Sequence, residues 1–165
     1  MSAPDGLRKK IGNWLLQEGW TLEAQAPPDP KIDWVVLATD DRSRRLLIYQ
    51  HVGHTDRLTV QGTLRISEAH RAAFAEMSAE EVESLLWQLR LELLRAGLDY
   101  DGLVQPLDEI RVVDVGFVEG VRLLGLSGFP TGSIEGLSKG EFFRRLHLVR
   151  RGANLVQFLI QQRLG

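Results

Sequence analysis

The sequence of 165 residues contains no cysteine. Without thiols the chain has no disulfide, no thiolate metal site and no cysteine nucleophile, which argues against a secreted scaffold held by disulfides. It also lacks the roughly 18 consecutive apolar residues that a membrane-spanning helix requires. The N-terminal segment shows no signal peptide, because its basic pair lies within alternating polar and apolar residues. We therefore expect a soluble cytoplasmic protein without a membrane segment.

The chain has little excess charge of either sign, since its net charge is -2 at pH 7. Such a balance argues against general affinity for nucleic acids or membrane surfaces. Hydrophobic residues make up 44% of the chain and charged residues 25%, which is typical of a globular protein. A chain of this length buries well over half of its unfolded surface on folding. We therefore expect residues 1–165 to form a single domain.

Apolar residues recur with helical spacing in three segments, at residues 7–19, 78–97 and 138–165. The second and third segments begin with the S-x-x-E pattern of a capping box, and glycine follows the first two. A shorter helical piece opens at Ser67. The predicted buried stripes of the first two segments are Leu7, Ile11, Trp14 and Leu15, and Val82, Leu85, Leu86, Leu89 and Leu93.

Residues between these helices alternate with the period of two that is typical of strands. Residues 32–66 predict a three-stranded meander, preceded by a short edge segment at 20–24, and residues 110–129 predict a hairpin. The connections are local, without the crossovers that a parallel sheet needs. We predict an α+β fold in which a mostly antiparallel sheet of about five or six strands packs with three main helices, in the order α-β-β-β-α-β-β-α.

The closing helix carries more apolar side chains than one buried stripe needs. Leu148, Leu155 and Leu159 lie roughly 120° or more around the helix from the predicted core stripe. Gly152 in the middle of this helix indicates the close approach of a neighbouring backbone. The core stripe consists of Phe142, Leu146, Val149, Ala153, Val156 and Ile160.

The middle helix has a second apolar surplus outside its main stripe, at Trp87, Leu91 and Leu94. Surplus apolar faces either pack against other helices of the same chain or present a surface to another molecule. Both interpretations remain open, and two such helices favour a homodimer, the commonest symmetric assembly. The candidate partner or dimer surface is therefore Leu148, Leu155, Leu159, Trp87, Leu91 and Leu94.

Signals of catalysis are weak in this sequence. His51, His54 and Asp56 are zinc-ligand types at a plausible spacing, and with a fourth ligand they would indicate a small metal-dependent hydrolase. Two histidines at the end of a hairpin are the competing interpretation. The glycine-rich run at 125–140 lacks the spacing of a phosphate-binding loop. We therefore expect no enzyme activity, no cofactor and no bound metal, with the hydrolase as an alternative.

A third hypothesis is nucleic-acid binding through the arginines of the closing helix, Arg144, Arg145, Arg150 and Arg151. These side chains point in several directions around the helix, as on a solvated surface. Nucleic-acid binding is therefore the less favoured alternative.

The order of elements, with WLLQEGW at Trp14–Trp20 and the predicted hairpin IRVVDVGFVEGVRLLGL, resembles the type III secretion chaperone-like fold. The chain is most similar to uncharacterised bacterial and archaeal proteins grouped there as a family of unknown function. The resemblance covers nearly the whole chain and implies a small, dimeric, non-enzymatic protein that binds a peptide or protein client. It supplies no catalytic residue. We predict a non-catalytic, chaperone-like binding module.

Overall fold

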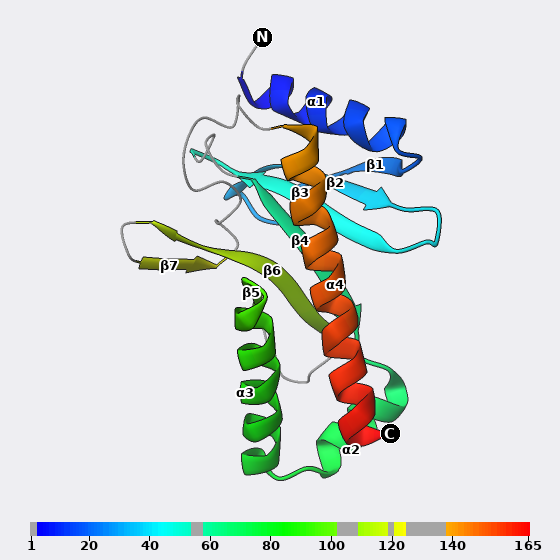
Figure 1. The fold of residues 1–165 in the computed structure, drawn as a ribbon, viewed down its shortest axis with the longest axis vertical. Helices are drawn as coiled ribbons and strands as arrows, with labels where there is room; N and C mark the ends of the chain where they lie inside the picture. Colours follow the sequence, from blue (N-terminus) through cyan, green and yellow to red (C-terminus); the bar gives the residue numbers. More distant parts are fainter. Residues whose placement is uncertain (1–2, 54–57, 102–108, 119–120, 125–137) are drawn as a thin grey trace.

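A computed structural model describes residues 3–53, 58–101, 109–118, 121–124 and 138–165 (Figure 1). Within these ranges the chain forms four helices and seven strands. The fold is α+β, as predicted, and the predicted order of main elements is confirmed.

The helices are α1 (Ala3–Gln17), α2 (Glu68–Glu76), α3 (Ala79–Arg95) and α4 (Lys139–Leu164). The strands are β1 (Thr21–Gln25), β2 (Ile32–Thr39), β3 (Arg45–His51), β4 (Thr59–Arg65), β5 (Leu98–Asp101), β6 (Glu109–Val118) and β7 (Val121–Leu124).

The strands form one antiparallel sheet in which six follow the path β1-β2-β3-β4-β6-β5 and β7 pairs with β6. The meander and the hairpin are confirmed. Strand β5, which pairs along β6 directly after α3, was absent from the prediction. The predicted second hairpin strand is described only as far as Leu124, and the glycine-rich run before Ser138 lies outside the described residues.

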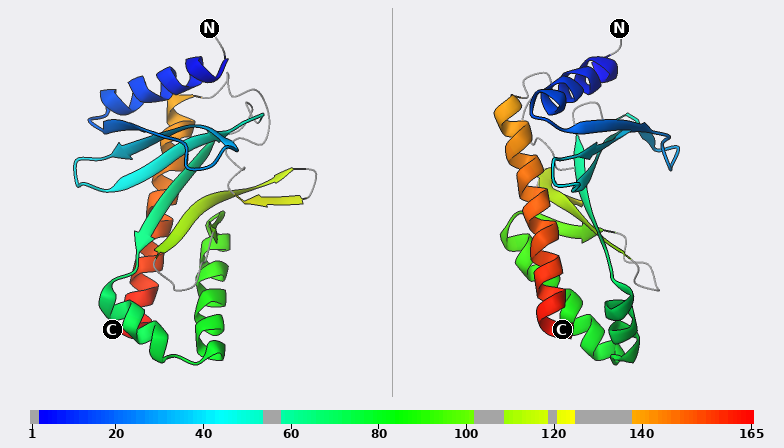
Figure 2. Two further views of the ribbon diagram at one scale, coloured as in Figure 1. Left: turned by 180° about the vertical axis from the view of Figure 1, so that it is seen from behind. Right: turned by 90° about the vertical axis from the view of Figure 1, so that its right-hand side faces the viewer.

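Helices α4 and α1 lie on the same face of the sheet. Helix α4 crosses β4 and β6, and the right-hand view of Figure 2 shows it running along one side of the strands. Helix α1 contacts β1, and its Trp14 ring lies 5.9 Å from the ring of Phe142 in α4. Helix α3 contacts both β5 and α4, while α2 contacts α4. The main core therefore lies between α4 and one face of the sheet.

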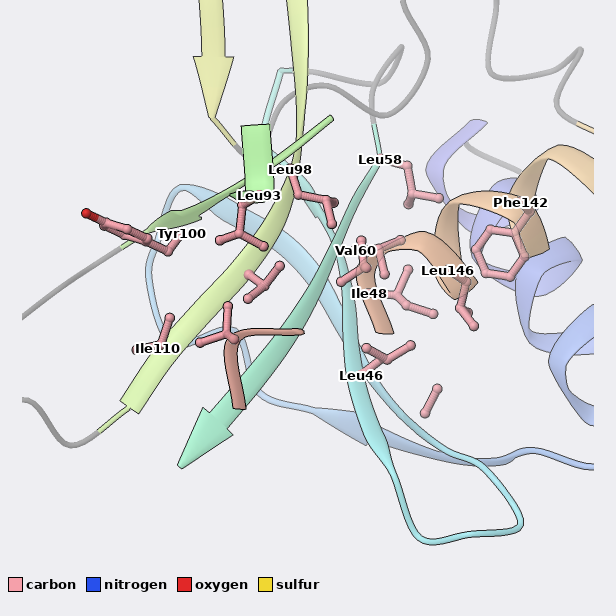
Figure 3. Packing of buried hydrophobic residues seen from close by; sticks show 14 of the residues in the cluster. Leu46, Ile48, Leu58, Val60, Leu93, Leu98, Tyr100, Ile110, Phe142 and Leu146 are labelled. Carbon is pink, nitrogen blue, oxygen red and sulfur yellow. The ribbon is translucent and has the colours of Figure 1, made fainter. Parts of the chain in front are cut away.

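Five of the six predicted core residues of α4 are buried, among them Phe142 and Leu146 in Figure 3, and Gly152 is buried as well. Gly152 is buried, whereas Ala153 beside it is half-buried. A methyl group at Gly152 would overlap Leu98 Cδ1 and would lie 3.1 Å from Val112 Cγ1. The close approach is therefore made by side chains of β5 and β6, and not by a neighbouring backbone as predicted. The buried residues of α4 are Phe142, Leu146, Val149, Gly152, Val156 and Ile160.

Helix caps follow the sequence signals closely. Ser78 Oγ accepts a hydrogen bond from the Glu81 amide at 3.2 Å, and the Glu81 carboxylate accepts one from the Ser78 amide at 3.3 Å. This reciprocal pair is the predicted capping box of α3. At the start of α4, Ser138 Oγ accepts from the Glu141 amide at 3.1 Å, but the Glu141 carboxylate accepts from Arg144. The prediction of a second capping box holds for its first half.

Candidate functional site

Helix α3 exposes two large apolar side chains one turn apart. Trp87 is 54% exposed and Leu91 is 52% exposed, while Leu94 beside them is half-buried. The opposite face of the helix supplies the core, so these residues are not needed for packing the sheet. The core residues of α3 are Leu85, Leu89 and Leu93, each with no exposed surface.

Charged residues continue this apolar face at both of its ends. Glu83, Trp87, Leu91 and Arg95 follow one another at four-residue spacing, so they form one ridge that is inclined to the helix axis. Glu83 and Arg95 are both exposed, and Arg95 Nη1 lies 2.8 Å from Glu92 Oε1. The α3 stripe, as we call these four residues, is apolar in the middle, acidic at its first end and basic at its last. Its charged ends were not predicted from the sequence, although their four-residue spacing can be read there.

Arg90 lies between the α3 stripe and the sheet. Its guanidinium carbon is 5.9 Å from the centre of the Trp87 ring and 4.4 Å from that of Tyr100. Its Nε donates a 3.0 Å hydrogen bond to the buried carboxylate of Asp99. Burial raises the pKa of the Tyr100 hydroxyl; the charge of Arg90 opposes this shift and that of Asp99 adds to it. Asp99 and Tyr100 hold the Arg90 guanidinium in place, and Trp87 contacts this cation.

The second stripe of α4 is less exposed than that of α3. Leu148, Leu155 and Leu159 are all half-buried, and Leu148 and Leu159 pack against the core of the same chain. Phe158, on the remaining side of α4, is 60% exposed. Of the six predicted surface residues, the structure therefore leaves Trp87 and Leu91 the most accessible.

Over the described ranges, no helix is long and apolar enough to cross a membrane.

The predicted metal ligands fall only partly within the described residues. His51 is half-buried at the end of β3, with its ring 5.4 Å from the ring of Tyr49. His54 and Asp56 lie outside the described residues. Within the part of the chain that the structure describes, no three histidine, aspartate or glutamate side chains are grouped to hold a metal ion. The zinc hypothesis stays a prediction.

The arginines of α4 are distributed among different neighbours. Arg144 Nη2 lies 3.0 Å from Glu141 Oε2, and Arg150 Nη1 lies 3.3 Å from Asp40 Oδ2. Arg145 is half-buried and Arg151 is exposed. Arg144 and Arg150 are thus opposed by carboxylates. This arrangement weakens the hypothesis of a nucleic-acid surface on α4.

Asp40 joins the turn between β2 and β3 to α4. Its carboxylate accepts hydrogen bonds from the amides of Arg42 and Arg44, each at 2.9 Å, and from Arg44 Nε at 2.8 Å. Burial opposes ionisation of Asp40, but these donors and the Arg44 charge outweigh it and lower the pKa of Asp40. Asp40, Arg44 and Arg150 therefore form a structural junction in which the carboxylate accepts hydrogen bonds from both guanidinium groups.

Residues 7–160 match the profile of a family described as "Uncharacterized conserved protein (DUF2299)". The chain belongs to this family. The match extends from α1 almost to the end of α4, so it covers the whole fold. The predicted membership of an uncharacterised family is confirmed. Among curated proteins, none matches the sequence of this DUF2299 protein.

One solved structure similar to the DUF2299 protein is the crystal structure of an uncharacterized protein from Methanothermobacter thermautotrophicus. The two chains share 23% sequence identity with a TM-score of 0.71, and the match covers 96% of this chain and 99% of the other. At this level of identity the likeness shows a shared fold and nothing further.

Proposed function

We propose that this DUF2299 protein is a non-catalytic protein-binding module that works as a homodimer through the α3 stripe. The observation that carries the proposal is the exposure of Trp87 and Leu91, each more than half exposed and one helical turn apart. Adjacent large apolar side chains on a surface are typical of an association site. Burying one such side chain completely stabilises a complex by about 1.5–3 kcal/mol.

The α3 stripe is complementary to itself. When two α3 helices pack antiparallel about a two-fold axis midway between Trp87 and Leu91, Trp87 meets Leu91 of the partner subunit. The same axis brings Glu83 opposite Arg95 of the partner subunit. A two-fold interface forms every contact twice, so both the apolar centre and the charged ends are matched. This complementarity is the reason for proposing a second copy of the chain as the partner.

A chaperone-like role completes the proposal. The order of elements resembles the type III secretion chaperone-like fold, whose members are small dimers that bind peptides or proteins. We place the protein in the cytoplasm, since a chain without cysteine suits a reducing compartment. The client would be a peptide or protein segment.

The test is the absolute mass in solution, measured by light scattering over a range of concentrations. We expect the wild type to have twice the mass of the chain and a Trp87→Glu, Leu91→Glu variant to be a folded monomer. The matched control is Leu16→Glu on α1, because Leu16 is 58% exposed but lies outside the α3 stripe. This control is expected to remain dimeric. A monomeric wild type, or a dimeric double variant, overturns the proposal.

A further inference from the structure

The sheet face opposite α4 carries a groove of about 1040 Å³. Its floor is formed by residues of β2, β3, β4 and β6, and residues 25–29 lie along one side. The volume is close to that of sites that hold small organic ligands, roughly 300–1,000 Å³. The proposed dimer does not use this groove, since α3 and α4 contribute no residue to its lining.

Three arginines gather around Thr63 at one end of the groove. Thr63 pairs with Arg111 across β4 and β6. Arg45 lies one step beyond the pair that joins Leu46 to Gly62, which places it opposite Thr63 on the other side. Arg65 follows two residues after Thr63 and shares its face. Side chains directly opposite one another have Cβ atoms about 4.5–5.5 Å apart, and diagonal ones about 7–8 Å, so the three arginine side chains start from positions next to Thr63 on one face of the sheet.

The charge at this end is not balanced. Glu109 Oε1 accepts from Arg111, at 2.9 Å from Nε and 2.8 Å from Nη2. Arg45 and Arg65 form no ion pair within the described residues, although Glu109 also lies opposite Arg65 across β4 and β6, and both arginines are exposed. Asp29, the other acid of the groove, precedes the end of β2 that pairs with His51, so it lies at the opposite end. The arginine end therefore retains two uncompensated positive charges.

The Thr63 hydroxyl supplies a further donor at this end of the groove. Thr63 Oγ1 accepts a 3.1 Å hydrogen bond from Gln61 Nε2, which occupies one of its acceptor positions. Its proton is left for an oxyanion. An arginine guanidinium also presents paired N–H groups that match the oxygens of a phosphate. Two charges and a hydroxyl donor suit a dianionic group better than a single carboxylate, because a phosphate monoester carries about -1.5 to -2 charges at pH 7.

The middle of the groove is apolar. Leu37 and Leu47 form a cross-strand pair there, and both are half-buried. Tyr49 farther along is only 8% exposed, and its hydroxyl donates to Gln61 Oε1 at 3.2 Å. Its ring therefore lacks the open face on which nucleic-acid bases stack. An organic group beside the phosphate would instead lie on the leucines.

We infer that this groove binds a small organic phosphate monoester. Arg45, Arg65 and Thr63 hold the phosphate, with Arg111 beside it, and Leu37 and Leu47 contact the organic part. The inference is independent of the dimer, because a folded monomeric variant of the α3 stripe keeps the whole groove.

The test is titration calorimetry of the full chain with phenyl phosphate as the probe, inorganic phosphate and benzoate being run beside it. We expect saturable binding of phenyl phosphate, with weaker binding of the two comparison anions, since one lacks the apolar part and the other lacks the second charge. The double variant Arg45→Gln, Arg65→Gln is expected to bind phenyl phosphate about tenfold or more weakly, because each arginine supplies charge-assisted hydrogen bonds.

The matched control is Arg151→Gln with Arg163→Gln, which removes the same charge from exposed positions of α4 outside the groove. It is expected to bind phenyl phosphate as the wild type does. Equal losses in the two double variants would show a general charge effect and overturn the inference. No saturable binding to the wild type, or binding of an acidic peptide or a single-stranded oligonucleotide in place of phenyl phosphate, would also overturn it.

Discussion

Gly152 allows α4 to pack close to β5 and β6. In most helices alanine is more stable than glycine by about 1 kcal/mol. Here the added methyl group would overlap Leu98 and press on Val112, so we predict that Gly152→Ala lowers the free energy of unfolding by about 1–3 kcal/mol in urea denaturation. Gly140→Ala is the matched control, because Gly140 faces open space near the start of the same helix. If both substitutions raise the free energy of unfolding, the close packing inferred around Gly152 is contradicted.

His147 links stability to pH. Burial lowers the pKa of His147, and the positive charges of Arg150, Arg151 and Arg44 lower it further. The unfolded chain, whose histidine pKa is about 6.5, then takes up a proton more readily than the folded protein. The stability that depends on neutral His147 is therefore fully present above the unfolded-state pKa of about 6.5. It is lost as the pH falls through that value towards the lower pKa of the folded state.

We predict that the free energy of unfolding falls less with decreasing pH in the His147→Gln variant than in the wild type. The measurement is urea denaturation at a series of pH values from about 7.5 to 5, a range that brackets the histidine pKa of the unfolded chain. Arg163→Gln, in the last turn of the same helix, serves as a control that keeps the wild-type profile. An unchanged profile in the His147 variant would exclude this residue as the cause.

At the scale of the elements, the start of α3 depends on its capping box. Ser78→Ala leaves the Glu81 amide without its side-chain partner, and we predict a loss of about 1 kcal/mol in the free energy of unfolding. Ser84→Ala, an exposed position inside the same helix, separates capping from the general effect of alanine. That control is expected to be neutral or slightly stabilised. Equal effects of the two changes, measured by urea denaturation, would contradict the role of the cap.

Helices were the most predictable elements because their signals are local. The Ser78 capping box, the glycine after α1 and the buried stripe of α4 all depend on residues within a few turns of one another. Strand β5 was missed because Leu98–Asp101 is too short to show a period, and its place in the sheet is fixed by pairing with β6.

At the scale of the whole molecule, tertiary contacts decide which apolar faces are covered. Periodicity gave Leu148 on α4 and Trp87 on α3 equal weight as surface candidates. The fold packs Leu148 against the core and leaves Trp87 exposed, a difference that no spacing within either helix contains. The same holds for Arg45 and Arg111, which approach Thr63 only through the register of three strands.

The central claim is that the α3 stripe is covered by a second copy of the chain. Because the chain has no native cysteine, Gln88→Cys on the exposed side of α3 provides a single site for a spin label. The measurement is the distance between labels on different chains by electron-electron double resonance. Packed helices have axes about 8–10 Å apart, so we predict a short, well-defined distance between chains. The signal should vanish when Trp87→Glu and Leu91→Glu are added. A folded, labelled protein that shows no distance between chains, or the same distance with both glutamates present, would contradict the claim.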